Sequence, residues 1–340
     1  MAVAMLLSGA AVSPVPATSV DARVDALAQE VRKAGWLIYG ARSDNGTWDL
    51  FVSRPDGSAA RNLTNTPDYE EAGPRVAPDG TRMLFRRMPR DTKIDHDKWG
   101  FQGQLVLSSL DAKQQEALGD EGEYPWASWS PDSKQIACLT LKGIQFVDLA
   151  TRKVVRTLPR LGMFQQLYWS PDGKWFCGVS NHFGSTWTIA RMDAATGDVN
   201  AVREHRNCTP DWCPDSEHII MSSRPQGQTG DNGYGYTQLW IARGDGSDQR
   251  LVYGEDGAHI YGGAQSPDGR YALFTSTPKD GSGAAKNGGI IGIMRMADAP
   301  SIGGPSPDLR IVHPDTKDGP VLWLGKGWEP FWTNADMGVQ

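Results

Sequence analysis

The sequence lacks the features that mark several large classes of protein. It has no basic excess, because 34 lysines and arginines stand against 40 aspartates and glutamates and the formal net charge is −6. Nucleic-acid-binding proteins usually carry a basic footprint, so no nucleic-acid partner is expected. No apolar run is long enough to cross a bilayer as a helix, so no transmembrane segment is expected.

Common enzyme and metal signatures are also missing. The nucleophile pattern GxSxG does not occur, and no phosphate-binding or dinucleotide-binding glycine motif stands between a strand and a helix. The four cysteines show no CxxC spacing. These absences argue against α/β-hydrolases, nucleotide-dependent enzymes and zinc ribbons.

The sequence is rich in glycine, proline and tryptophan, with 39, 22 and 13 residues, which is typical of many short strands joined by tight turns. One turn motif recurs, as APDG, SPDS, SPDG, CPDS and SPDG. Its aspartates are separated by 53, 40, 43 and 53 residues, and they are Asp79, Asp132, Asp172, Asp215 and Asp268. This period fits one four-stranded propeller blade and is too long for most helical repeats.

The strands between the turns close the count at six blades. Each turn joins an inner strand to a strand of alternating apolar residues, and a second strand–turn–strand element follows in most repeats. The first strands, WLIYGARS and WDLFVS, lack an inner strand, and GWEPFWTNAD near the end is a lone inner strand. Their pairing completes a sixth blade. We therefore predict an all-β, six-bladed propeller of four-stranded antiparallel blades over residues 34–334, with about fifty residues per blade.

Three short segments flank the predicted propeller. Residues 1–22 are apolar and then rich in small residues, which predicts a signal peptide ending at Ala17 or Ala22, with a disordered apolar tail as the alternative. Residues 23–33 predict a short helix, and residues 335–340 a tail. We expect a periplasmic or secreted monomer.

The SPDG repeats, the DG turns that follow them and the closing EPFW strand resemble the TolB-like propeller family, also described as WD40-like or PD40 repeats. The resemblance covers residues 34–334 and implies the fold but no function. TolB itself has a sizeable N-terminal α/β domain, for which residues 23–33 leave no room. A role in the Tol–Pal system is therefore not implied.

The strand order assigns the loops to two faces. The SPDG-type turns and the DG turns of the outer hairpins share one face, here called the turn face. The loops between second and third strands and the crossovers between blades share the other, here called the loop face. The loop face carries the long insertions, such as RMPRDTKIDHDKWGFQGQ and RPQGQTGDNGYGYTQ. Long loops on a rigid scaffold are where binding usually takes place.

The candidate site residues are polar or aromatic residues of the loop face. Crossover residues should border the mouth of the central channel, where they would bind a ligand or simply stay hydrated. The predicted binding residues are Glu71, Glu123, Tyr124, Gln166, Arg206, Asn207 and Glu329 at the mouth, with Trp99 and Tyr234 in the loops. The candidate catalytic residues are His182, His205, His259, Tyr236 and Tyr261, and the three histidines are also the candidate metal ligands.

Two functions fit these residues. The first is a binding module that recognises a protein, peptide or carbohydrate ligand at the channel mouth of the loop face, where aromatic side chains suit sugar stacking or a protein hot spot. The alternative is a polysaccharide lyase acting on uronates, because some related propellers, oligogalacturonate lyase among them, are lyases that use histidines and a metal ion. A divalent metal ion (Mn, Zn or Ca) or Arg206 would neutralise the uronate carboxylate, and a histidine or tyrosine would take the α-proton.

Overall fold

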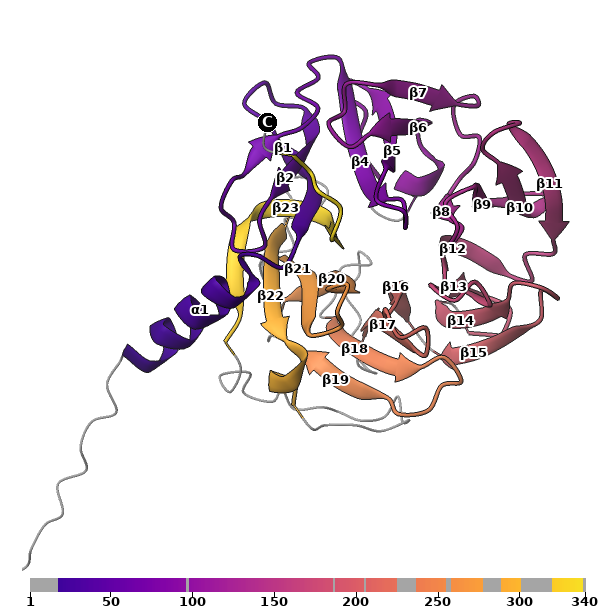
Figure 1. The fold of residues 1–340 in the computed structure, drawn as a ribbon. Helices are drawn as coiled ribbons and strands as arrows, with labels where there is room; N and C mark the ends of the chain where they lie inside the picture. Colours follow the sequence, from indigo (N-terminus) through magenta and orange to yellow (C-terminus); the bar gives the residue numbers. More distant parts are fainter. Residues whose placement is uncertain are drawn as a thin grey trace, which may run out of the picture.

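The computed structural model describes residues 18–95, 98–185, 187–204, 206–224, 237–254, 258–277, 289–300 and 320–338. Its strands form a ring of antiparallel sheets around a central axis, with one helix outside the ring (Figure 1). The predicted six-bladed propeller is confirmed. In the described part of the chain, no helix is both long enough and apolar enough to cross a membrane.

Four blades are separate four-stranded sheets, ordered from the inner to the outer strand except where noted. Blade two holds β4 (Tyr69–Val76), β5 (Arg82–Pro89), β6 (Gln104–Ser109) and β7 (Gln115–Leu118). Blade three holds β8 (Ser128–Trp129), β9 (Gln135–Thr140), β10 (Gly143–Asp148) and β11 (Lys153–Leu158). Blade four holds β12 (Met163–Trp169), β13 (Trp175–Ser180), β14 (Thr188–Asp193) and β15 (Val199–Arg203). Blade five holds β16 (Asn207–Trp212), β17 (His218–Ser223), β18 (Gln238–Arg243) and β19 (Arg250–Tyr253).

Blades six and one form a single seven-stranded sheet because they share one strand. Blade six contains β20 (His259–Gln265), β21 (Tyr271–Thr277) and β22 (Gly289–Arg295), and blade one contains β1 (Trp36–Arg42), β2 (Trp48–Ser53) and β3 (Arg61–Asn62). The shared strand is β23 (Leu322–Thr333). Two short 3-10 helices, η1 (Trp99–Phe101) and η2 (Met296–Asp298), lie in loops.

The long strand β23 closes the ring. Its second half is the inner strand of blade one, where Trp332 pairs with Leu37. Its first half is the outer strand of blade six, where Leu322 pairs with Ile293. The predicted closure by a C-terminal inner strand is confirmed, and the structure adds that the same strand completes blade six.

Helix α1 (Thr18–Val31) covers the joint between blades six and one. It begins before residue 23, where the sequence placed its start. Leu27 is fully buried against this joint. Glu30 accepts hydrogen bonds from Tyr271 Oη and from Arg295, whose Nε and Nη2 lie 2.9 and 2.7 Å from Glu30 Oε2. The hydrogen bonds from Arg295 lower the pKa of Glu30.

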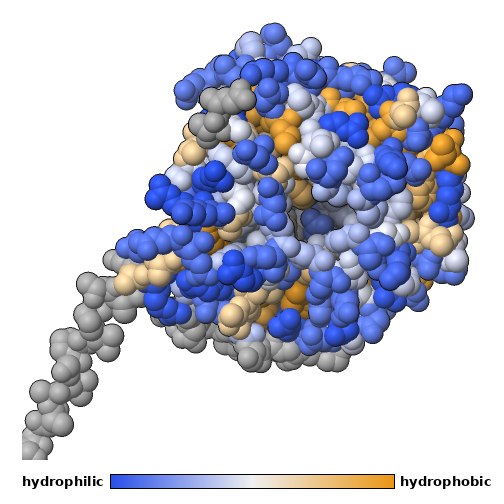
Figure 2. Space-filling view, in the orientation of Figure 1, coloured by the Kyte–Doolittle hydropathy of each residue, from blue (hydrophilic) through white to orange (hydrophobic). Residues whose placement is uncertain are grey.

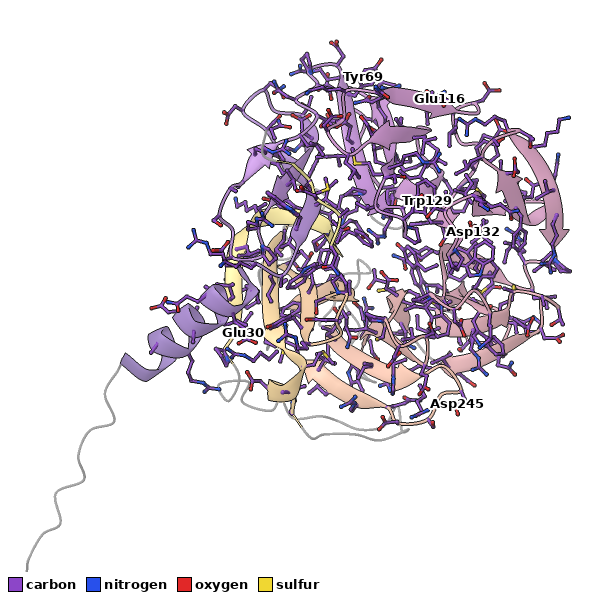
Figure 3. All side chains as sticks on the ribbon, viewed as in Figure 1. Glu30, Tyr69, Glu116, Trp129, Asp132 and Asp245 are labelled. Atoms are coloured by element: carbon purple, nitrogen blue, oxygen red, sulfur yellow. The ribbon has the colours of Figure 1, made fainter. Side chains whose placement is uncertain are left out.

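The recurring turn is held by its aspartate. In blade three, Asp132 Oδ1 accepts hydrogen bonds from Ser130 Oγ at 2.6 Å and from the backbone N–H of Lys134 at 3.1 Å. The hydrogen bond from Ser130 lowers the pKa of Asp132. Trp129 and Asp132 lie near the ring axis in Figure 3, whereas Glu116 and Asp245 lie at the perimeter. The turns therefore surround the central opening.

Serine replaces the last glycine of this motif in blades three and five for a structural reason. Ser133 and Ser216 both have a φ of 59°, a left-handed conformation that costs a non-glycine residue about 1–2 kcal/mol. Each hydroxyl accepts a hydrogen bond, at 3.0 Å, from the backbone N–H of the turn aspartate of the preceding blade, Asp79 or Asp172. The two serines thus join neighbouring blades.

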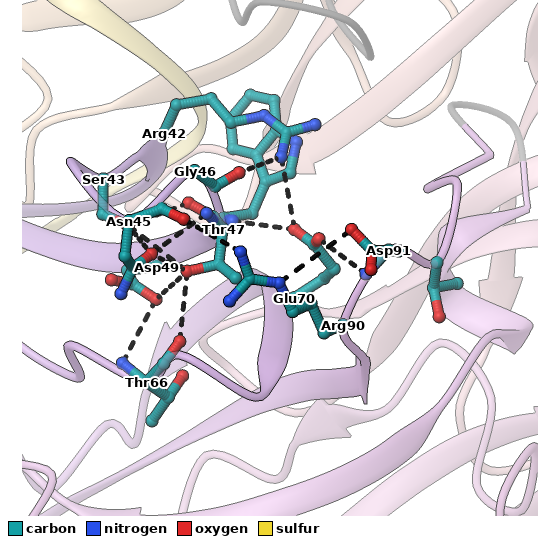
Figure 4. A network of polar contacts seen from close by, with 12 residues as sticks. Arg42, Ser43, Asn45, Gly46, Thr47, Asp49, Thr66, Glu70, Arg90 and Asp91 are labelled. Atoms are coloured by element: carbon teal, nitrogen blue, oxygen red, sulfur yellow. Dashed lines mark hydrogen bonds and ion pairs between the residues drawn. The ribbon is translucent and has the colours of Figure 1, made fainter.

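A network of polar contacts joins blades one and two on the loop face (Figure 4). The buried Glu70 accepts hydrogen bonds from the backbone N–H groups of Trp48 at 2.8 Å and Asp91 at 3.1 Å. Its carboxylate also lies 3.5 Å from Arg42 Nη1. Glu70 therefore fixes the loop that follows β5 against the turn between β1 and β2.

Candidate functional site

A funnel opens at the centre of the turn face, with a cavity volume of about 510 Å³. The space-filling view shows that the centre of the ring is hollowed (Figure 2). Every blade lines the funnel with equivalent residues, counted back from its turn aspartate or, in blade one, from Ala335. The residues four positions before it, here called the floor ring, are Phe331, Arg75, Ser128, Tyr168, Asp211 and Ala264.

The wall of the funnel is largely tryptophan and proline. The residues three positions before the turn aspartate are Val76, Trp129, Trp169, Trp212, Gln265 and Trp332, and the prolines are Pro78, Pro131, Pro171, Pro214 and Pro267. Three of the indoles donate their N–H inside the protein, to the carbonyls of Arg75, Tyr168 and Gly173 at 2.9–3.1 Å. These indoles therefore offer the funnel apolar surface and no free N–H donor.

Arg75 is the cation of the floor ring. Its Nη2 donates a hydrogen bond to Tyr168 Oη at 3.0 Å and lies 3.6 Å from the Glu329 carboxylate. Its guanidinium lies over the rings of Tyr168 and Phe331, with centroids at 5.0 and 5.4 Å. Burial alone would lower the pKa of Arg75, but Tyr168, Asp211 and Glu329 raise it above its usual value. Arg75 therefore stays charged.

Asp211 and Tyr168 are the titratable neighbours of Arg75 in the floor ring. Burial raises the pKa of Asp211 to about 6, although Arg75 acts in the opposite direction. Burial also raises the pKa of Tyr168, so its hydroxyl stays protonated at neutral pH. The floor of the funnel thus holds a carboxylate that loses its charge in mild acid.

Below the floor ring, each inner strand contains one residue in a left-handed conformation. This second set, here called the bulge ring, comprises Gly73, Trp126, Gln166, Thr209, Gly262 and Glu329, with φ between 46° and 62°. Side chains of the ring satisfy the backbone of the next blade, because Thr209 N donates to Gln166 Oε1 at 2.8 Å and Gly262 N donates to Thr209 Oγ1 at 3.2 Å. A cavity of about 10 Å³ lies between the two rings, about the volume of one water probe.

Indole rings cover the loop-face end of the inner strands. Trp99, in η1, contacts Trp126 and Trp328 with ring centroids at 4.8 and 5.7 Å, and Trp48 contacts Trp328 at 6.0 Å. Gly73 is required at this point, because a Cβ there would lie 2.1 Å from the Trp99 ring. The insertion that was expected to form a binding loop therefore packs its tryptophan into the core.

The polar channel mouth expected on the loop face is not open. The predicted binding residues Glu71, Gln166, Asn207, Glu329 and Trp99 are buried, because the loop that carries Trp99 covers this end and the inner strands use their polar atoms. Asn207, for example, donates to the carbonyls of Arg203 and Glu204. Glu123 and Arg206 are exposed and Tyr124 is half-buried, so a binding role for these three stays a prediction.

The structure gives the candidate histidines separate surroundings. His182 is exposed, with its ring centroid 5.2 Å from that of Phe183. His259 is buried, with Nδ1 3.0 Å from Thr237 Oγ1 and its ring centroid 5.2 Å from that of Tyr261. His205, Tyr234 and Tyr236 lie outside the described residues. Within the described ranges, no three His, Cys, Asp or Glu side chains are placed to hold a metal ion, and the three-histidine site stays a prediction.

The sequence analysis missed the floor ring because it searched the loop face. A signal was present, since the residue four positions before each turn aspartate changes from arginine to serine, tyrosine, aspartate and alanine along the repeats. A position that varies in charge within an otherwise regular repeat is a candidate for recognition. The turn motif alone gave no indication that this residue points into the channel.

Comparison of the sequence with known proteins identifies no function. No family model matches the chain. The curated protein "Uncharacterized protein Atu1656" from Agrobacterium fabrum is 32% identical over 120 residues, which is 33% of this chain and 36% of that protein. The matched segment therefore spans about a third of that relative.

Comparison of the structure supports the fold. TolB from Acinetobacter baumannii superposes with a TM-score of 0.62 at 19% identity, covering 93% of this chain and 73% of TolB. A chain of a nidogen/laminin complex superposes with a TM-score of 0.55 at 8% identity, covering 84% of this chain and 96% of its own. Oligogalacturonate lyase from Vibrio parahaemolyticus gives 0.46 at 16% identity, covering 76% and 70% of the two chains. The fold is thus a TolB-like propeller, and the lyase similarity is too distant to bear on activity.

Proposed function

We propose that this TolB-like propeller is a binding module whose funnel receives a peptide segment of a partner protein. The observation that carries the proposal is the 510 Å³ cavity, to which all six blades contribute aromatic residues or prolines above a charged floor. Ligand sites are typically apolar clefts of about 300–1,000 Å³ with a few convergent polar groups.

A peptide fits the funnel better than a carbohydrate does. A sugar needs many hydrogen-bonding partners, whereas Trp129, Trp169 and Trp212 already donate their indole N–H groups within the protein. Apolar side chains of a peptide can fill the space between these rings and the prolines. Aromatic surfaces of this kind are typical of the hot spots of protein interfaces. In the described ranges, no observation favours the lyase alternative.

The test is selection of peptides from a random phage-displayed library against the full chain. Ala264→Phe fills the floor of the funnel, and Phe331 shows that a floor-ring position holds phenylalanine in blade one. Arg206→Ala, on the exposed loop face, is the matched control. We expect selected peptides to lose binding to the Ala264→Phe variant and to keep it with the control. The opposite result would place the site on the loop face and overturn the proposal.

Export is the second part of the proposal, and it rests on the apolar leader. Helix α1 begins at Thr18, directly after Ala17. Cleavage after Ala17 would leave the helix whole, whereas cleavage after Ala22 would remove its first turn. We expect N-terminal sequencing of the protein from a periplasmic or culture-medium fraction to start at Thr18. Recovery of the intact chain from the cytoplasm alone would contradict export.

A further inference from the structure

The charges beneath the funnel do not balance. Among the described residues that line it, Arg75 and Asp211 carry charge. They belong to blades two and five, which are opposite each other in a ring of six blades. Glu329 of the bulge ring lies next to Arg75, with 3.6 Å between Oε2 and Nη2. At neutral pH these three side chains sum to one negative charge.

Arg75 has its partners within the protein. Its Nη2 is bound to Tyr168 and paired with Glu329, and its Nη1 donates to the carbonyl of Pro74 at 3.0 Å. Its remaining donor, Nε, is buried, so a ligand in the funnel does not reach it. A ligand anion would also meet the carboxylates of Glu329 and Asp211. The arginine is therefore a structural counter-ion and a poor anchor for an anionic ligand.

Asp211 is less well satisfied. It accepts one hydrogen bond in the described structure, from the backbone N–H of Trp212 to Oδ1 at 2.8 Å. The remaining lone pairs of its carboxylate border both the funnel and the small cavity beneath it. A buried carboxylate with so few donors is costly, and a cation brought by a ligand relieves that cost.

The wall above Asp211 suits the stem of a cationic side chain. Trp212 and Pro214 follow Asp211 along the chain and line the funnel with it. Lysine and arginine bury their apolar stems along such surfaces while the charged end reaches a polar group. Aromatic faces also attract cations directly.

We infer that the peptide recognised by the funnel inserts a lysine or arginine side chain whose charged end pairs with Asp211. The inference rests on the proposed function, since it names the chemistry of the ligand for the same site. Its two recognition elements are the carboxylate at the floor and the tryptophan and proline wall above it.

The pairing also makes binding depend on pH. The titratable and charged groups that face Asp211 are Arg75 of β4, Tyr168 of β12, Cys177 of β13, Glu329 of β23 and, beyond its own strand, Cys213. Burial keeps the two thiols and the tyrosine neutral by raising their pKa values. Asp211 is thus the member of this group that changes charge near pH 6, and binding should weaken as the pH falls through that value.

The experiment compares selected peptides on wild-type protein and on the isosteric Asp211→Asn variant. A synthetic peptide that depends on the funnel is measured by calorimetry beside its copy with norleucine in place of lysine. Each single change should weaken binding about tenfold or more, and the two changes together should weaken it no further, as expected for a directly paired cation and carboxylate. Between pH 7.5 and 5, the lysine peptide should lose affinity and the norleucine peptide should not.

The outcomes separate this inference from the proposed function. If Ala264→Phe abolishes binding but peptides show no enrichment in lysine or arginine, or if Asp211→Asn leaves affinity unchanged, the cation inference is wrong and the funnel remains the site. If Ala264→Phe has no effect, the proposed function itself is wrong. Enrichment in aspartate or glutamate would overturn the inference and would identify Arg75 as the anchor.

Discussion

Glu71 should make the protein less stable as the pH rises, and Glu71→Gln should remove that effect. The side chain is fully buried, Oε1 accepts a hydrogen bond from Thr66 Oγ1 at 3.2 Å, and Oε2 has no partner. Burial, together with the nearby Asp49, raises the pKa of Glu71 from 4.5 to about 7. Between these two values the folded chain holds a proton that the unfolded chain has released, so the free energy of unfolding falls as the pH rises.

The size of the effect follows from the shift. A difference of this size corresponds to about 3 kcal/mol at pH 8, since each pKa unit is worth about 1.4 kcal/mol. We expect Glu71→Gln to be more stable than wild type by up to about 3 kcal/mol at pH 8 and close to wild type at pH 4.5. Urea unfolding followed by tryptophan fluorescence at pH 4.5, 6 and 8 measures this difference.

The exposed Glu121 provides the matched control, because Glu121→Gln removes a carboxylate that lies in solvent. Its effect on the free energy of unfolding should stay within about 0.5 kcal/mol at every pH. A Glu71→Gln effect that is the same at pH 4.5 and pH 8 would refute the argument from burial.

Three further predictions concern packing. Trp99→Ala should lower the free energy of unfolding by about 3–5 kcal/mol in urea, because it empties the indole cluster; a loss below 1 kcal/mol would contradict that packing. Ser133→Ala and Ser216→Ala should each cost about 1 kcal/mol in thermal unfolding, and the glycine variants less, because glycine relieves the left-handed strain; the reverse order would be inconsistent with the strain. Glu30→Ala should speed proteolysis within α1, since it loses the contact with Arg295, and unchanged cleavage would show that the helix is held by apolar packing alone.

The blade architecture could be predicted from the sequence because its signal is local. A proline, an aspartate and a glycine or serine set the turn geometry within four residues, and five copies in register indicate a repeat. The closing strand was also predictable, because GWEPFWTNAD had no partner elsewhere. The sharing of β23 between two blades was not, since nothing in its first half distinguishes an outer strand from a loop.

The site could not be predicted to the same extent because it depends on tertiary contacts. Trp126, Gln166, Thr209 and Glu329 adopt left-handed conformations that their residue types do not favour, and the surrounding strands impose them. These bulges shift the alternation of each inner strand and so decide which side chains face the channel. Trp99 lies in a polar insertion, and the sequence gives no sign that it packs beside Trp328.

The shared strand has a consequence for biosynthesis. Because β23 lies near the end of the chain and completes two blades, the ribosome releases most of the propeller with the edges of β1 and β22 bare. Bare edges are templates for pairing with another chain. Ring closure is therefore a late event in vectorial folding, and the same strand is the segment through which two nascent copies would exchange partners.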